Sequence, residues 1–121
     1  MLYNLTREKV LAERTKLASK FFRRLRGLMF SRSFPKTYEA LIISPCNAVH
    51  TMFMFYPIDV VFVNEKLQVI HFCPVLRPGR FSPLVKGCRQ VVELPAGTVA
   101  HTGTQIGDYL SFHPENGKEM F

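Results

Sequence analysis

The sequence predicts a mainly β protein, an antiparallel β-sandwich or partly closed barrel with one or two short peripheral helices. Short runs rich in β-branched residues follow one another along the chain. Gly, Pro and Asn residues separate these runs, and only two segments have helical spacing. At 121 residues and 47% hydrophobic composition, the chain fits a single globular domain over residues 1–121. We expect its core at about residues 9–113 and a frayed tail over 114–121.

The N-terminal third contains two predicted strands and one predicted helix. Residues 9–18 alternate as an edge strand does, although their Ala, Leu, Glu and Lys residues also suit a helix. Ser19 can cap a helix to about Met29, with Phe and Leu residues on one side and arginines on the other. Residues 39–44 then form a strand that Pro45 ends.

The central and C-terminal segments supply the remaining strands and a second helix. The extended segments are residues 48–54, 58–63, 67–72, 88–94 and 107–112. Residues 64–66 predict a tight turn, and residues 75–83 contain three turn-forming Pro and Gly residues. Pro95 suits the first turn of a short helix, and Gly103 suits its end.

The charge of the chain is concentrated at its N-terminal end. Residues 1–40 contain 10 Lys or Arg and 3 Glu, whereas residues 41–121 contain 6 basic and 6 acidic residues. The first segment therefore carries the whole net charge of +7. Such a basic stretch is either a solvated amphipathic face or a surface that attracts a polyanion such as nucleic acid. The candidate polyanion-binding residues are Lys20, Arg23, Arg24 and Arg26.

The sequence does not support a secreted, membrane-spanning, disulfide-bonded or metal-binding protein. The first ten residues carry charge where a signal peptide needs its apolar core, and no apolar run reaches the ~18–20 residues that span a bilayer. We therefore expect a cytoplasmic protein without a membrane span. The three cysteines lack a C-x-x-C spacing and predict reduced thiols. The four scattered histidines predict no metal site, and we expect no cofactor.

Five motifs in this order resemble the domain-of-unknown-function family 192. They are "RRLRGLMFS", "HTMFMFYPIDVVFV", "RPGRF", "VVELPAG" and "IGDYLSF", and the resemblance extends over about residues 13–112. It implies a compact, mostly β domain similar to a jelly roll or barrel, and it implies no activity, cofactor or substrate. Many members carry Trp-Met-Lys-Asn-Thr where this chain reads "AVHTMFM". A role assigned to that Lys-Asn form would not transfer to His50.

Four polar residues form the candidate ligand-binding site: His50, Thr51, Asp59 and Arg80. Pro57 breaks the apolar run around the first three, so the chain can turn there and bring them to one mouth of the β structure. Arg80 lies in the Pro/Gly loop, and loops at the end of a β scaffold often carry function. We expect apolar packing nearby from Phe53, Phe55 and Phe62. Each polar residue also has a structural explanation, since Asp59 can close a turn and His50 can sit in a core.

The sequence leaves three functions open. The first is a small non-catalytic binding module for an unknown small molecule or protein, because no complete catalytic set of residues is visible. The second is a hydrolase-like or other enzyme that uses His50 and Asp59 as acid and base. The third is binding of nucleic acid or another polyanion through the basic N-terminal stretch.

Overall fold

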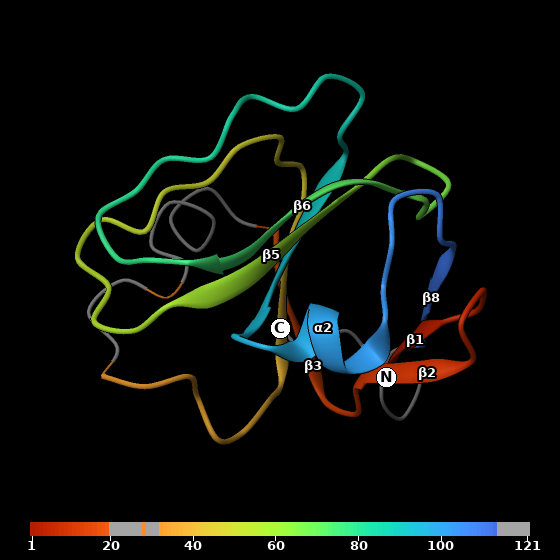
Figure 1. Ribbon diagram of the computed structural model, residues 1–121, viewed down its shortest axis with the longest axis horizontal. Helices are drawn as coiled ribbons and strands as arrows, with labels where there is room; N and C mark the ends of the chain where they lie inside the picture. The colour runs from red at the N-terminus through yellow and green to blue at the C-terminus, as the bar shows by residue number, and fades with distance from the viewer. Residues whose placement is uncertain (20–27, 29–31, 114–121) are drawn as a thin grey trace.

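The computed structural model describes residues 1–19, 28 and 32–113 (Figure 1). The predicted helix over residues 19–29 and the tail over 114–121 lie outside these residues, apart from Ser19 and Leu28. The described residues form two sheets and one short helix, α2, at Thr98–Thr102. Figure 1 shows the smaller sheet and α2 together on one side of the larger sheet.

The smaller sheet joins strands from the two ends of the described chain. It has the order β2-β1-β8, and all its pairs are antiparallel. Its strands are β1 (Leu2–Asn4), β2 (Lys9–Ala12) and β8 (Leu110–Phe112). Behind it, the buried carboxylate of Asp108 accepts hydrogen bonds from Asn4, Arg7 and the Gln105 amide at 2.9–3.0 Å. Burial would raise the pKa of Asp108, but these hydrogen bonds lower it below its usual value.

The larger sheet has five strands in the order β3-β4-β7-β5-β6. These strands are β3 (Thr15–Ala18), β4 (Ala40–Ile43), β5 (Ile58–Val63), β6 (Val69–Leu76) and β7 (Gln90–Pro95). The mainly β prediction is confirmed. Neither sheet closes into a barrel within the part of the chain that the structure describes. The wholly antiparallel expectation needs one correction, because β3 pairs with β4 in parallel.

The predicted strand over residues 9–18 is two strands that belong to different sheets. The break falls at Arg14, whose backbone N–H and guanidinium both donate to the carboxylate of Glu39 at 2.9 Å. This ion pair lies just before β4 and directs the chain from one sheet to the other. A partner 25 positions away cannot be recognised from local alternation.

The larger sheet is buried on both faces, and its inner strand β5, between β7 and β6, contributes to both cores. Val61 and Val63 pack with residues of the smaller sheet and with Val99 of α2. Val60 and Phe62 point the other way, into a second core covered in part by loop residues. The members of that cover from the two long loops include Cys46, Val49, Met54, Tyr56, Val85 and Cys88. Each fully buried Val or Phe side chain stabilises the fold by about 1.5–3 kcal/mol.

Candidate functional site

Two long loops that cover the second core run side by side (Figure 1). We call their paired parts, residues 47–51 and 77–85, the loop ribbon. Amides of Thr51, Ser82 and Val85 donate to the opposite loop at 2.8–2.9 Å. The extended segment predicted at residues 48–54 is therefore not a strand of a sheet. Only His50 of this segment forms a β-bridge, and its partner is Phe81 of the other loop.

Thr51 organises one end of the loop ribbon. Its side chain is fully buried, and its hydroxyl accepts the Arg80 N–H at 2.8 Å while donating to the Arg77 carbonyl. Its own carbonyl accepts the N–H of Gly79 at 2.9 Å. The turn at residues 77–80 needs this support, because Gly79 has a φ of 74°. Thr51 therefore fixes the backbone that presents two arginine side chains.

His50 and Arg80, two more of the predicted site residues, lie beside Thr51. The half-buried His50 ring accepts the Met52 N–H on Nδ1 at 3.2 Å, and its centroid lies 6.1 Å from that of Phe81. An accepting Nδ1 leaves the proton of the neutral ring on Nε2. The Arg80 side chain is exposed. The structure thus brings together three of the four predicted residues.

Asp59 is the fourth predicted residue, and its contacts lie elsewhere. Its carboxylate is fully buried and accepts the amides of Val75 and Val99, both at 2.8 Å. The first bond holds a β-bulge opposite Ile58–Val60, where Val75 adopts a φ of 49°. The second bond ties α2 to β5. Within the described residues, no hydrogen bond joins Asp59 to His50, Thr51 or Arg80.

The outer surface of these loops carries large apolar side chains. The exposed fractions are 58% for Phe53, 66% for Phe55, 74% for Phe81 and 75% for Leu84. Of the three phenylalanines expected to pack near the polar cluster, Phe53 and Phe55 are exposed, and Phe62 is buried in the second core. Phe53 also has a φ of 63°, which is uncommon for a bulky residue. Large exposed apolar side chains are a feature of interaction sites when they form a continuous patch.

The same two loops carry positive charge only. Residues 44–57 and 77–89 contain four Lys or Arg residues and no Asp or Glu. The four cations are Arg77, Arg80, Lys86 and Arg89, and all of them are exposed. Across residues 1–19 and 32–113, the two ion pairs are Arg7–Asp108 and Arg14–Glu39, so the loop cations engage no acidic partner there.

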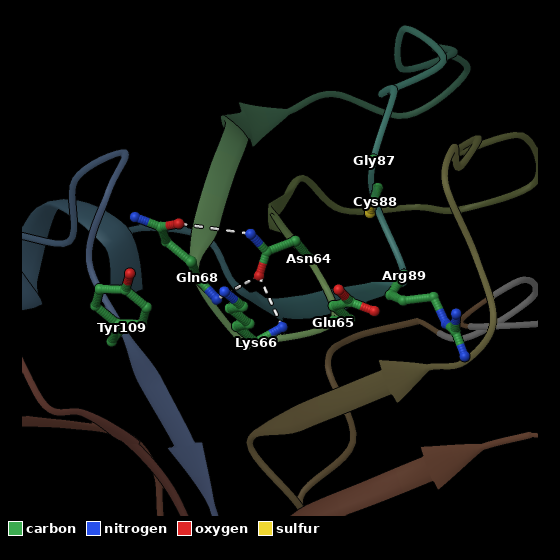
Figure 2. Close-up of a pocket in the computed structure, with 8 residues that line it drawn as sticks. All are labelled: Asn64, Glu65, Lys66, Gln68, Gly87, Cys88, Arg89 and Tyr109. Atoms are coloured by element: carbon green, nitrogen blue, oxygen red, sulfur yellow. Dashed lines mark hydrogen bonds between the residues drawn. The ribbon is translucent and has the colours of Figure 1, made fainter.

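A polar cleft of about 600 Å³ opens where the second loop returns to the sheet (Figure 2). Its walls are the turn at residues 64–66, Gln68, Tyr109 and the segment 87–89. Asn64 shapes the turn, because its side-chain oxygen accepts the amides of Lys66 and Gln68 at 2.9 and 3.0 Å. In Figure 2, Tyr109 and Gln68 lie on one side of the cleft and Arg89 on the other.

One buried ionisable residue, Glu93, was not among the predicted site residues. It lies on β7 on the same face as Val91, which belongs to the second core, and only 3% of it is exposed. Its Oε2 has no hydrogen-bond partner among the residues that the structure covers. Burial raises the pKa of Glu93 to about 8. The carboxyl group is therefore protonated at neutral pH.

Four further predictions concern the cysteines, metal binding, membrane spans and the basic N-terminal residues. The three cysteines are half-buried and form no disulfide with one another, and burial raises the pKa values of Cys73 and Cys88, so both remain thiols. In the described ranges, no three His, Cys, Asp or Glu side chains are grouped to hold a metal ion. None of the helices found there has the length and apolarity to cross a bilayer. The polyanion candidates Lys20, Arg23, Arg24 and Arg26 lie outside the described residues.

Sequence reasoning missed the acid-free loops, the exposed rings and the cleft. The absence of acidic residues from the loops could be read from the sequence. Residues 77–89 contain four cations and no acid, although residues 41–121 are neutral overall. The exposure of the rings was not visible, because an apolar residue in a loop normally predicts burial. The cleft depends on segments that are distant in the sequence.

Comparison with protein families gives one match over nearly the whole chain. Residues 4–112 match the family model DUF192, described as "Uncharacterized ACR, COG1430". A UPF0127 protein of Thermococcus sibiricus is 32% identical over 120 residues, covering 95% of this chain and 76% of that protein. UPF0127 protein PF1050 of Pyrococcus furiosus is 30% identical over 117 residues, covering 93% and 97% respectively.

Two crystal structures share the fold. One is a protein of unknown function from Novosphingobium aromaticivorans, with a TM-score of 0.72, 22% identity and coverage of 81% of this chain and 74% of that one. The other is a putative transcription regulator from Sinorhizobium meliloti, with a TM-score of 0.68, 22% identity and coverage of 80% and 79%. At this identity, the likeness concerns the fold alone.

Proposed function

The chain belongs to the uncharacterised DUF192 (COG1430) family, and we propose that it is a non-catalytic binding module whose loop ribbon recognises an anionic partner. One observation carries the proposal: two loops that contain no acid carry both four exposed cations and exposed aromatic rings. Cations attract an anionic partner at long range, and apolar contact holds it at short range.

The polar side chains of the loop ribbon support binding rather than chemistry. The Thr51 hydroxyl is occupied by backbone groups of Arg77 and Arg80, and both Asp59 oxygens accept backbone amides. Groups used in this way hold a surface in shape, and a preformed surface binds with a smaller loss of conformational entropy. His50 and Arg80 are the predicted residues whose side chains can reach a ligand.

Heparin chromatography tests the proposal with a matched pair of variants. Arg80→Glu reverses a charge on the loop ribbon, and Lys9→Glu makes the same change on β2 of the smaller sheet. Both side chains are exposed, so both variants should fold. We expect Arg80→Glu to elute at clearly lower salt than Lys9→Glu. Equal elution of the two variants would show that net charge alone determines retention, and the proposal would then fail.

A further inference from the structure

We infer that the anionic partner is a single-stranded nucleic acid whose bases stack on the exposed rings and whose phosphates follow the cations of residues 77–89. The inference rests on the proposed function and adds the chemical class of the partner. Single-strand binders combine a basic track with aromatic platforms, because every base has a face that can stack.

The aromatic platform lies beside Thr51. Phe81 follows Arg80, whose backbone N–H donates to the Thr51 hydroxyl. The Phe81 ring is 74% exposed, and the half-buried His50 ring lies 6.1 Å from it, so the two rings offer a combined surface. The hydrogen bonds of Thr51 fix this arrangement before a ligand binds.

The basic track leads from the rings to the cleft. Along residues 77–89 the chain carries Arg77, Arg80, Lys86 and Arg89, and the last of these lines the cleft of about 600 Å³. Lys66 and the exposed Tyr109 are on the cleft walls, so a cation and a ring recur there, and with Arg89 the two cations outnumber the one acidic wall residue, Glu65 (Figure 2). A flexible strand can pass along the loop ribbon and place a terminal nucleotide in the cleft.

Two other anionic partners fit these observations less well. A nucleic acid duplex keeps its bases stacked inside, so it would leave the phenylalanine rings unused. An anionic lipid surface would accept the rings and the cations, but it cannot enter a concave polar cleft. The cleft and the rings together therefore favour a single strand.

Fluorescence anisotropy with a labelled twelve-nucleotide oligo-dT or oligo-U tests the inference at low salt. Phe81→Leu keeps an apolar side chain but removes the ring, and we expect it to weaken binding at least about fivefold, the lower end of base stacking. Arg80→Gln should reduce the slope of log K against log salt by about 0.7, the value for one lost phosphate contact. Lys9→Gln and Ile106→Ala, which change exposed residues elsewhere, should bind within about twofold of the wild type.

The outcomes separate this inference from the proposed function. If neither Phe81→Leu nor Arg80→Gln changes the affinity for the oligonucleotide, the inference is overturned, and another basic stretch binds the strand. If the protein instead binds phosphatidylserine vesicles, with and without Phe81→Leu, and fails to bind the single strand, that result would overturn the inference in favour of a lipid partner. In that case the heparin difference between Arg80→Glu and Lys9→Glu would persist, and the proposed function would stand. If that difference is also absent, both proposals fail.

Discussion

The buried acceptors Thr51, Asp59 and Asp108 each bind at least one backbone amide, whereas the buried Glu93 has an oxygen with no partner in the described structure. The first three each stabilise a loop or a helix end that would otherwise leave donors unsatisfied. Glu93 contributes no such bond, and its burial disfavours the charged form. Its effect on stability therefore depends on pH.

Glu93 should make the protein less stable as the pH rises from about 4.5 to about 8. In the unfolded chain Glu93 releases its proton near 4.5, whereas in the folded protein it keeps the proton up to about 8. The folded state thus binds more protons across this window, so the free energy of unfolding decreases with increasing pH. Urea denaturation should show a loss on the order of a few kcal/mol between pH 5 and pH 8.

Glu93→Gln provides the control, because it keeps the shape of the side chain and cannot ionise. The variant should lack this part of the pH dependence and should exceed the wild type in stability at pH 8. Parallel pH profiles of the two proteins would show that the Glu93 carboxyl group ionises freely in the folded state.

At the scale of elements, Asp59 joins three parts of the fold that local sequence does not connect. It lies on β5, and its two oxygens hold the bulge of β6 and the first turn of α2. Val75 can keep a φ of 49°, which is strained for a β-branched residue, because its amide is bound in this position. The bulge lies just before the loop ribbon, so Asp59 also sets where the ribbon begins.

Asp59→Ala should destabilise the protein by about 1–3 kcal/mol, because two buried amides lose their acceptor. The midpoint of urea denaturation measures this loss. Asp59→Asn retains one side-chain oxygen and should lose less than the alanine variant. An unchanged midpoint for Asp59→Ala would mean that water replaces the carboxylate at both amides.

The elements that sequence predicts best are those set by local pattern. Strand β5 coincides with the predicted segment 58–63, since a β-branched run buried on both faces has few alternatives. The helix prediction placed its start at Pro95, but Pro95 still pairs with Ile58, and α2 begins at Thr98. Strand β1 was not predicted, because its three residues are too few to show a periodic pattern, and pairing with β2 and with β8, far along the chain, holds it in the sheet.

The candidate site was predictable in part for the same reason. The loop position of Arg80 suggested that it joins His50 and Thr51, whereas the expected turn at Pro57 did not bring Asp59 to them. Backbone pairing between the two loops places Arg80 beside Thr51. The separate role of Asp59 depends on amides of Val75 and Val99, which are 16 and 40 positions away. No periodicity in the sequence reports a contact of that kind.

At the scale of the whole molecule, the five-stranded sheet couples the two cores. Neighbouring residues of β5 face opposite cores, with Val61 in one and Val60 in the other. A loss of packing on either face therefore weakens the same strand pairs with β6 and β7. The two cores should unfold together.

Val60→Ala and Val61→Ala test this coupling, since each removes two carbon atoms from one core. Each should lower stability by about 1–3 kcal/mol and leave a single transition. Calorimetry, with far- and near-ultraviolet circular dichroism, measures whether the transitions coincide. Two separate transitions in either variant would show that the cores are independent units.

The pairing of β1 with β8 has a consequence for how the protein is made. Asn4 and Asp108, which bond behind this pair, are 104 positions apart. At a synthesis rate of about 5–20 residues per second, the ribosome exposes β1 for roughly 5–20 s before β8 emerges. During that interval the nascent β1–β2 hairpin has an unprotected edge of the kind that pairs with other chains. Final docking of β8 removes that edge, so chaperone capture of the growing chain should be strongest before residues 110–112 leave the ribosome.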